Sequence, residues 1–138
     1  MTAWYEPQHK RLFITVHVKD DKTGKLHPAK PYESDGIELF LDRSLFELPW
    51  ENYGSKTSHL FFLRKDGVQK QNGIICSMND RKDGYTATFE IQLPDGWIGF
   101  DIGVNDSDGE KRKTQLIWNG TADNHMNRDH FKLIKIQK

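Results

Sequence analysis

The sequence predicts an all-β fold, an antiparallel β-sandwich of jelly-roll-like type with seven to ten short strands and almost no helix. Apolar and polar residues alternate in several short runs, which is the period of strands that bury one face. Residues that favour turns separate these runs at the spacing typical of an antiparallel sandwich or barrel. The only helix candidate, residues 44–48, is too short to change the fold class.

Eight runs of the chain have the pattern of a strand. The first alternates from Leu12 to Val18, and the second, Gly36–Asp42, has Glu38 on the face opposite its apolar residues. The run Tyr85–Leu93 alternates most regularly, with Glu90 on its polar face. The predicted strands are, in order, residues 12–19, 36–42, 59–64, 74–78, 85–93, 99–105, 114–118 and 131–136.

The stretches between these strands have the composition of loops and turns. Residues 20–30 are charged and contain glycine and proline, which predicts a surface loop. Residues 43–58 are expected to form a long connection, and residues 65–67 a turn. Asp83-Gly84 is a dipeptide typical of β-hairpins, so the strands on either side of it are expected to pair.

Length, charge and apolar content limit the possible functions. A chain of 138 residues is the size of one domain, residues 1–138, and 20 basic residues balance 20 acidic ones. This balance provides no electrostatic attraction to nucleic acid or to an anionic membrane. No apolar run reaches the roughly 20 residues that span a bilayer, and the N-terminus does not resemble a signal peptide. The single cysteine, Cys76, excludes an internal disulfide and is expected to be buried and inert.

The run Gly99–Arg112 has the pattern of a strand that enters an oxygen-rich turn. Its apolar residues at 100, 102 and 104 alternate with Asp101, Gly103 and Asn105. A second strand-like run, residues 114–118, follows the turn directly. The unit is therefore predicted to be a β-hairpin with a polar face.

The turn of this hairpin contains two candidate metal ligands, Asp106 and Asp108. Hard oxygen ligands beside a tight glycine turn suit Ca²⁺. An EF-hand is excluded because Ile117 occupies the position of the bidentate glutamate. The alternative is a turn whose side chains bond its own backbone, with Arg112 paired to an aspartate.

The polar and aromatic residues favour recognition over catalysis. Glu38 and Glu90 are the candidate carboxylate pair of a glycosidase, but mid-strand carboxylates are usually solvated or bonded to neighbours. The histidines lack the paired spacing of a zinc site. Exposed rings beside polar groups are typical of sugar recognition, and the loop or turn aromatics are Tyr32, Trp50, Tyr53 and Trp97. The alternative is that these rings cover the ends of the core.

Two motifs make the sequence resemble a known family. Residues 35–42 form the run Asp-x-x-Glu-x-Phe-x-Asp, and residues 99–106 form Gly-Phe-Asp-x-x-Val-Asn-Asp. Together with Val16–Asp20, Gly84–Glu90 and Phe131–Ile136, they resemble carbohydrate-binding module family nine over nearly the whole chain. The resemblance implies a β-sandwich appended to xylanases and other secreted polysaccharide-active proteins, with calcium bound in some members. It also implies a further β segment ahead of the first predicted strand, which this chain is expected to lack.

The resemblance also implies a set of site residues. Family members that bind sugar hold a chain end between two aromatic rings, while a glutamate, an arginine and amides contact the hydroxyl groups. Tyr32 matches the first ring and Glu38 the glutamate, and Asn105 is expected near the floor of the site. The late loop offers Asn124 as the amide and His125 at the place of the second ring.

Two positions depart from the family pattern. The arginine position falls near Phe61, unless the strand register lets Arg64 serve. The second ring is replaced by His125 or Met126, so weaker or altered sugar binding is expected.

The leading interpretation is a non-catalytic carbohydrate-binding module for plant polysaccharide or oligosaccharide of the cellulose or xylan type. The resemblance implies that it belongs to a larger multidomain glycoside hydrolase or surface protein and lies outside the cell or at its surface. A second interpretation is a structural or protein-interaction module with little or no sugar binding. A third is haem binding, known from related sandwich domains, through Met78, His125 or Met126. Neither nucleic acid nor a membrane is an expected partner.

Overall fold

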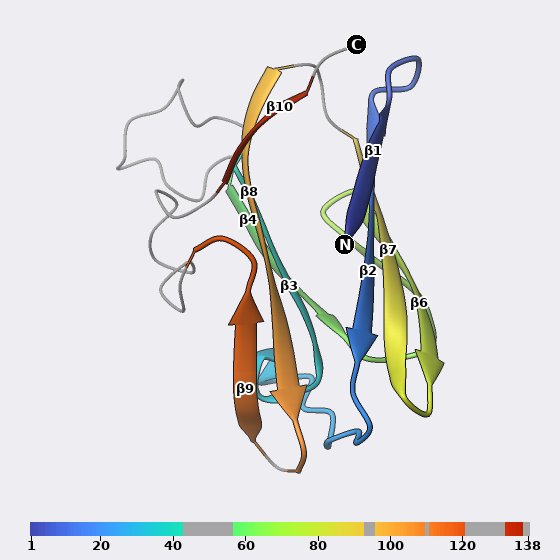
Figure 1. Cartoon of the computed structure of the whole chain (residues 1–138), viewed down its shortest axis with the longest axis vertical. Coiled ribbons are helices and arrows are strands. Elements are labelled where there is room, and N and C mark those ends of the chain that lie inside the picture. Colours follow the sequence, from blue (N-terminus) through green and yellow to red (C-terminus); the bar gives the residue numbers. More distant parts are fainter. Residues whose placement is uncertain (43–56, 93–95, 110, 121–131, 137–138) are drawn as a thin grey trace.

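Two antiparallel β-sheets face each other in the computed structural model, which describes residues 1–42, 57–92, 96–109, 111–120 and 132–136 (Figure 1). The first sheet has the strand order β1-β2-β7-β6-β5, and the second has the order β10-β8-β3-β4, with β9 also paired to β8. The strands are β1 (Thr2–Glu6), β2 (Arg11–Lys19), β3 (Gly36–Asp42), β4 (Thr57–Leu63), β5 (Gly67–Gln71), β6 (Ile74–Arg81), β7 (Gly84–Gln92), β8 (Gly96–Ser107), β9 (Arg112–Ile117) and β10 (Lys132–Ile136). The predicted antiparallel sandwich is therefore confirmed.

Helix is almost absent from the described part of the chain, as predicted. One turn of 3-10 helix, η1 (Pro31–Glu33), precedes β3. Across the residues that the structure describes, no helix is long and apolar enough to cross a membrane.

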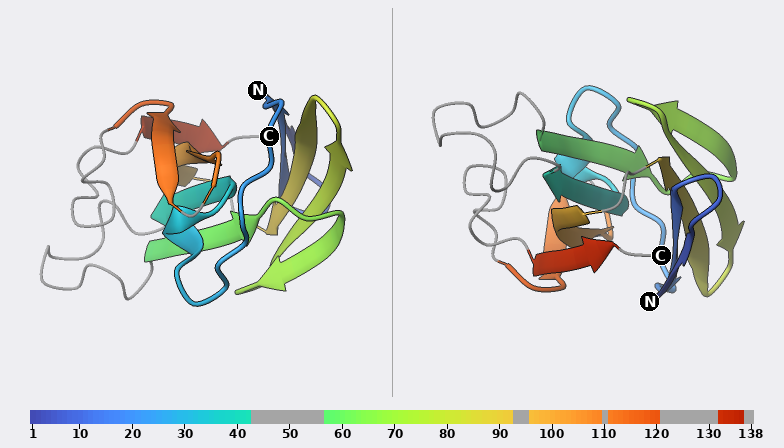
Figure 2. Two further views of the ribbon diagram at one scale, coloured as in Figure 1. Left: turned by 90° about the horizontal axis from the view of Figure 1, so that it is seen from below. Right: turned by 90° about the horizontal axis from the view of Figure 1, so that it is seen from above.

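The core lies between the two sheets, which Figure 2 shows along their edges. Alternation in β2, β3, β7 and β8 directs the apolar residues into this space, and its fully buried side chains include Ile14, Leu39, Phe89 and Phe100. Phe62 of β4 meets Phe89 of β7 edge to face, with ring centroids 5.1 Å apart, so the two sheets interlock at their centre. Burial raises the pKa of Cys76 to about 12, which agrees with the inert thiol predicted from its apolar neighbours.

Two edge strands have no counterpart in the sequence prediction, and the expectation that no β segment precedes the first predicted strand is wrong, because β1 lies there. β1 pairs with β2, and β5 pairs with β6, each along one side only. Both strands are largely exposed. Since an edge strand of five residues buries few side chains, it has too short an apolar alternation to be recognised from the sequence.

The β6–β7 hairpin occurs where Asp83-Gly84 predicts it, although β6 extends to Arg81 instead of ending at Met78. Gly84 has a φ of 148°, and a Cβ on it would lie 2.0 Å from the carbonyl oxygen of Val18. Glycine is therefore required where this hairpin approaches β2.

Strand β3 differs from the prediction because both of its faces are buried. It lies between β8 and β4 in the middle of the second sheet, and every residue from Gly36 to Asp42 is buried. Its odd-numbered apolar residues face the first sheet, and Glu38, Phe40 and Asp42 lie on the opposite face. Glu38 is thus buried rather than solvated, and it marks the start of a polar site.

Candidate functional site

The outer face of the second sheet combines polar and aromatic side chains from four strands. Glu38 of β3 lies between Phe61 of β4 and Gly103 of β8 in the strand register. Two residues further along β3, and on the same face, Phe40 lies opposite His59. Directly opposed residues share a face of a sheet, so these side chains line one surface. We call it the Glu38 face and define it by Glu38, Phe40, His59, Phe61, Gly103, Asn105 and Gln115.

Glu38 is the centre of a hydrogen-bond network. Glu38 is only 4 % exposed, and its Oε2 accepts a hydrogen bond from Nε2 of Gln115. The same amide nitrogen donates to Oδ1 of Asn105 over 2.9 Å, and Nη1 of Arg112 donates to that oxygen over 3.3 Å. Nε2 of His59 lies 3.6 Å from Oε1 of Glu38. A carboxylate buried this deeply needs such partners, because burying it alone is costly.

Packing fixes the positions of the groups around Glu38. A Cβ on Gly103 would lie 2.9 Å from Cδ1 of Ile117 and 3.5 Å from Oε2 of Glu38, so glycine leaves room beside the carboxylate. The His59 ring stacks on Phe40 with centroids 4.4 Å apart and planes inclined by 18°. It also contacts Phe61 at a centroid distance of 4.7 Å. The imidazole is therefore held between two rings, facing the carboxylate.

Tyr32 lies on η1, which contacts β3, β4 and β8. The ring is 42 % exposed. The neighbouring Glu33 accepts a hydrogen bond from the backbone N–H of Arg112 over 2.8 Å, which fastens η1 to the strand that carries Gln115. The structure thus joins the turn of Tyr32 to the hydrogen-bond network of the Glu38 face.

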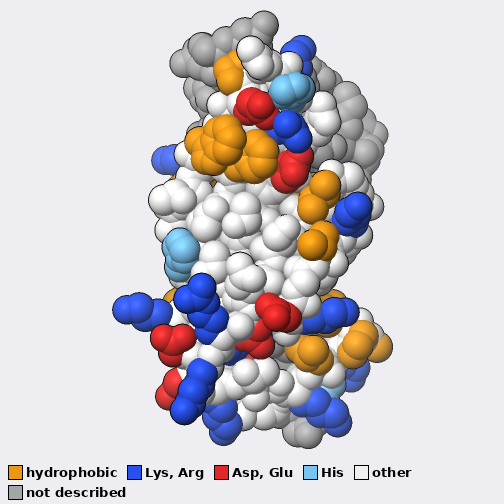
Figure 3. Space-filling view, turned by 90° about the vertical axis from the view of Figure 1, so that its right-hand side faces the viewer, with side chains coloured by type: hydrophobic (Ala, Val, Ile, Leu, Met, Phe, Trp, Pro, Cys, Tyr) orange, Lys and Arg blue, Asp and Glu red, His pale blue; other side chains and the backbone are white. Residues whose placement is uncertain are grey.

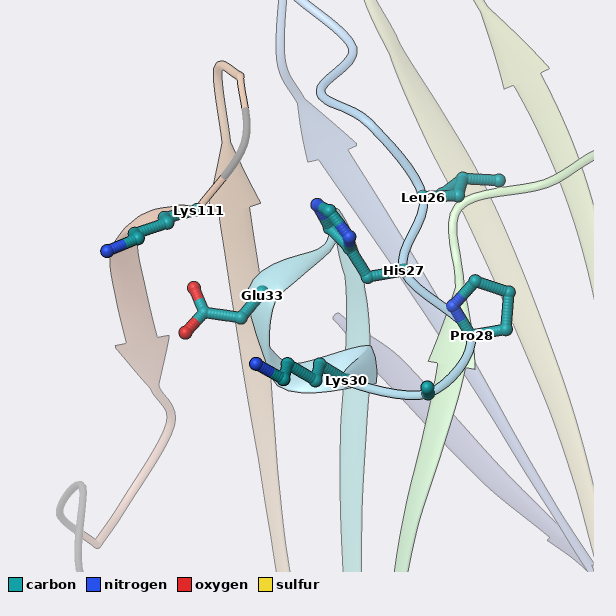
Figure 4. A pocket seen from close by; sticks show the side chains of 7 residues that line it. Leu26, His27, Pro28, Lys30, Glu33 and Lys111 are labelled. Atoms are coloured by element: carbon teal, nitrogen blue, oxygen red, sulfur yellow. The ribbon is translucent and has the colours of Figure 1, made fainter.

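A hollow of about 390 Å³ lies beside η1, and Figure 4 shows the side chains that line it. Lys30, Glu33 and Lys111 point the same way, with the Glu33 carboxylate between the two lysines. Leu26 and Pro28 lie across from them. None of the lining residues belongs to the Glu38 face, so this hollow is not part of that face.

Asp101, from the Gly-Phe-Asp motif, anchors the chain that leaves β9. Its Oδ1 accepts hydrogen bonds from the N–H groups of Ile102 and Asn119, each over 2.9 Å, and its Oδ2 accepts one from Gly120 over 2.6 Å. The motif aspartate therefore has a structural role at the start of the late loop. Asn124 and His125, which the resemblance assigns to the site, lie outside the described residues, as do Trp50 and Tyr53.

Arg64 lies on the inner face of its sheet, not on the Glu38 face. Arg64 is two residues beyond Phe62, which faces the core, so its side chain points the same way, and Arg64 is only 2 % exposed. Its Nε donates to Asp80 over 2.7 Å and its Nη1 to Asp20 over 3.0 Å. Nη2 donates to two backbone carbonyls of the β6–β7 hairpin. The condition under which Arg64 would serve as the hydroxyl-contacting arginine is not met, because the strand register turns it inward.

Asp106 and Asp108 form one cluster with Asp20, which lies far from them in the sequence and was not among the predicted metal ligands. Their carboxylate oxygens, one from each residue, lie within 4.8 Å of one another. Asp20 follows β2 of the first sheet, while Asp106 lies near the end of β8 of the second sheet and Asp108 directly follows β8, so the cluster bridges the sheets. The predicted pairing of Arg112 with an aspartate is wrong: Lys113 pairs with Asp108 at 2.6 Å, and Arg112 bonds Asn105.

Asp106 is held in surroundings that disfavour its negative charge. Burial raises the pKa of its carboxyl, and the charges of Asp20, Asp108 and Asp35 raise it further. Its Oδ1 is buried, and it has no hydrogen-bond partner within the described residues. The hydroxyl of Tyr85 is also buried without a hydrogen-bond partner among the described residues, and burial and the charge of Asp35 raise its pKa. A bound cation would offset this accumulation of oxygens, and hard oxygen donors fit Ca²⁺.

Comparisons with known proteins agree with this fold. The sequence profile of the family described as carbohydrate family 9 binding domain-like matches residues 3–136. Part of endo-1,4-beta-xylanase A from Thermoanaerobacterium saccharolyticum is 28 % identical to this chain. The alignment is 142 residues long and covers 94 % of this chain. The matched part is 11 % of the xylanase, so the chain spans about a tenth of that relative's length.

Two similar solved structures are family 9 carbohydrate-binding modules from Caldicellulosiruptor kristjanssonii. The one in complex with cellotriose has a TM-score of 0.76 and 22 % identity, covering 92 % of this chain and 69 % of its own. The one in complex with glucose has a TM-score of 0.76 and 21 % identity, covering 94 % and 72 %. At these identities the likeness establishes a shared fold.

Proposed function

The chain belongs to the carbohydrate family 9 binding domain-like family, and from this premise we propose that its Glu38 face binds an oligosaccharide or polysaccharide of the cellulose or xylan type. The molecule is a non-catalytic carbohydrate-binding module. The observation that carries the proposal is the buried network of Glu38, Gln115 and Asn105 on the sheet to which the turn of Tyr32 is tied. Its carboxylate and amides can accept and donate hydrogen bonds to hydroxyl groups, and an exposed ring offers a flat face for a pyranose.

The arrangement of carboxylates does not support glycoside hydrolysis. A glycosidase needs two carboxyl groups flanking one bond, on the order of 5–10 Å apart. Glu38 is on the outer face of the second sheet, and Glu90 is on the outer face of the first. The core separates them, so they cannot act on the same bond.

The similar proteins support the class of sugar and the setting. Cellotriose and glucose, named in the two similar structures, favour a β-linked glucose chain as ligand. The similar xylanase favours a place within a multidomain polysaccharide-active enzyme, and with it an extracellular location. The alternative of a purely structural module is not favoured by the family match.

Titration calorimetry against cellotriose and xylotriose, with maltotriose as a control for linkage, tests the proposed function. We expect heat of binding with at least one of the β-linked sugars and none with maltotriose. Absence of binding to both β-linked sugars at millimolar concentration, with and without Ca²⁺, would overturn the proposal.

Tyr32→Ala should weaken binding of the same sugars by about threefold to tenfold, because one ring contact contributes about 0.5–1.5 kcal/mol. The fold should be unaffected, since the ring is already 42 % exposed. Tyr32→Trp is the matched control and should retain or increase the affinity. Equal affinity of the alanine variant and the native protein, measured by calorimetry, would remove Tyr32 from the site.

We also propose that Asp20, Asp106 and Asp108 hold a structural Ca²⁺. The support is the convergence of their oxygens, the unpaired buried Oδ1 of Asp106, and the upward shift of its pKa. Ca²⁺ prefers six to eight oxygen ligands, which carboxylates and backbone carbonyls supply. A bound ion would join the two sheets at this end of the sandwich.

Saturating Ca²⁺ should raise the melting temperature by about 5 °C or more over that in chelator, because an ion that binds only the folded state stabilises it. Asp106→Asn should lose this rise. The variant should melt no lower than the native protein in chelator, since burial already disfavours the charge of Asp106. Asp66→Asn, at an exposed carboxylate, is the control and should keep the full rise. Equal melting with and without Ca²⁺ in the native protein would contradict the proposed ion.

A further inference from the structure

The outer face of the first sheet carries a second polar hollow, which lies on the opposite side of the molecule from the Glu38 face. It is an open groove of about 480 Å³ at the β1–β2 turn, lined by Gln8, His9, Lys10, Arg11, Glu90 and Gln92. The amide of Gln92 donates to the carbonyl of His9 over 3.2 Å, so the turn is tied to β7. The groove has hydrogen-bond donors and acceptors on both of its sides.

A stack of aromatic rings adjoins this groove. Trp4 and Phe13 are directly opposed on β1 and β2, and their rings stack with centroids 4.3 Å apart and planes inclined by 11°. The guanidinium of Arg11, which lines the groove, lies 5.7 Å from the centroid of Phe13. Trp4 remains 59 % exposed, so most of the indole is available to a ligand. An exposed ring therefore lies beside a groove that can form hydrogen bonds.

The charged groups between groove and rings are held in place. Nη1 of Arg11 donates to Glu90 over 2.7 Å, and its Nε donates to Glu6 over 3.1 Å. His9 contacts the other oxygen of Glu6 at 2.8 Å. These contacts connect three parts of the surface (β1, the turn and β7), so a ligand would meet a prearranged set of polar groups.

The rest of this face has the chemistry of a sugar-binding surface more than of a protein interface. Figure 3 shows hydrophobic side chains gathered beside acidic and basic ones, next to a broad area that is neither hydrophobic nor charged. Thr15 and Thr88 approach through their hydroxyls at 3.3 Å, and His17 contacts the hydroxyl of Thr86 at 3.0 Å. A stable protein interface needs about 800 Å² per partner with an apolar centre. The exposed apolar side chains Trp4 and Val68 lie at opposite edges of this sheet, with hydroxyls between them, and do not supply such a centre. A pyranose needs only one flat ring and nearby polar groups.

We propose that the groove at the β1–β2 turn and the exposed face of Trp4 form a second saccharide subsite, for a segment of a β-linked glucose or xylose chain. Trp4 stacks on one sugar ring, and Arg11, Glu90 and Gln92 contact its hydroxyl groups. The inference rests on the proposed function of the Glu38 face, because it assumes the same class of ligand. As the two sites lie on outer faces of opposite sheets, one molecule can engage two chains of a polysaccharide, and retention on the polymer then exceeds that of either site alone.

Amide chemical shifts of ¹⁵N-labelled protein, titrated with cellohexaose and with xylohexaose, test this subsite. In the native protein we expect shifts in two groups: around the Glu38 face, and at residues 8–11 and 90–92. Trp4→Ala should weaken the affinity that the second group of shifts reports by about threefold to tenfold, and leave the affinity from the first group unchanged. Glu38→Gln should have the opposite effect. Val68→Ala removes an equally exposed apolar side chain from the far edge of the same sheet and should alter neither group.

The outcomes separate this inference from the proposed function. Shifts confined to the Glu38 face, or a second group insensitive to Trp4→Ala, would overturn the second subsite and leave the first site standing. Absence of shifts at both places would overturn both. A dimer that forms in analytical ultracentrifugation and is lost in Trp4→Ala would assign the surface to a second copy of the chain and also overturn the inference. Trp4 is exposed, so the variant should fold, and the dispersion of its amide spectrum verifies this.

Discussion

Glu38→Gln should reduce the affinity for β-linked oligosaccharides by about tenfold or more while the protein stays folded. A hydrogen bond to a charged group contributes about 1.5–3 kcal/mol, and the carboxylate can accept from two donors at once. The amide keeps the volume of the side chain, so it fits the space that Gly103 leaves beside the carboxylate. Its oxygen can still accept from Gln115, which limits the loss of stability to about 1 kcal/mol.

Calorimetry and thermal melting should be measured on the same preparations of this variant. Asp66→Asn is the matched control, because it removes one negative charge from an exposed turn between β4 and β5 and should change neither affinity nor melting. Native affinity in Glu38→Gln would show that the carboxylate is present only to satisfy Gln115 and His59. In that case the ligand would have to bind elsewhere on the module.

Strands that bury one face are predictable from the sequence. Exposed edge strands, and the burial of a strand on both faces, are not. β2, β3, β7 and β8 have regular alternation because each contributes one apolar face to the core. β1 and β5 are exposed edge strands, and their pairing depends on neighbours rather than on their own apolar pattern. The burial of the second face of β3 is also not predictable, since it depends on what packs over the sheet.

The candidate site is partly predictable for a related reason. Glu38 and Asn105 lie in alternating runs, so their shared polar face follows from parity, and Tyr32 follows from the family resemblance. Gln115 was missed, although pairing the two strands of the predicted hairpin around residues 106–112 would have opposed it to Asn105. His59 has no such local signal, because its register with Phe40 is set across a long connection. Asp20 reaches Asp106 and Asp108 through the tertiary fold alone.

For Arg64, the alternation of side chains along the strand decides whether the residue can take the role that the family resemblance offers. Phe62 and Arg64 are two residues apart in an alternating run, so both face the core, while Phe61 shares the face of Glu38. The register therefore leaves Phe61 at the position of the family arginine and does not let Arg64 serve there. The consequence is that Arg64 acts as a buried brace instead of a ligand contact.

Arg64→Leu should lower the free energy of unfolding by about 3–5 kcal/mol, because removing one partner of a buried ionic network leaves the others uncompensated. Burial by itself would lower the pKa of Arg64, but the hydrogen bond to Asp80 and the charges of Asp80, Asp20 and Asp35 outweigh it and raise the pKa. The guanidinium also lies 5.2 Å from the centroid of the Tyr85 ring. The loss is large for a protein of this size, whose total stability is typically about 5–15 kcal/mol.

Denaturant unfolding of Arg64→Leu, Arg64→Lys and Arg81→Leu distinguishes a brace from a simple loss of charge. Lysine keeps the charge but cannot reproduce the forked contacts with Asp80, Asp20 and two carbonyls, so it should recover only part of the stability. Arg81→Leu removes the same charge at an exposed position and should cost less than about 0.5 kcal/mol. Sugar affinity of the folded fraction should be unchanged in all three, because the Arg64 side chain lies on the inner face of its sheet. Loss of affinity in Arg64→Lys without loss of stability would instead return this arginine to the sugar site.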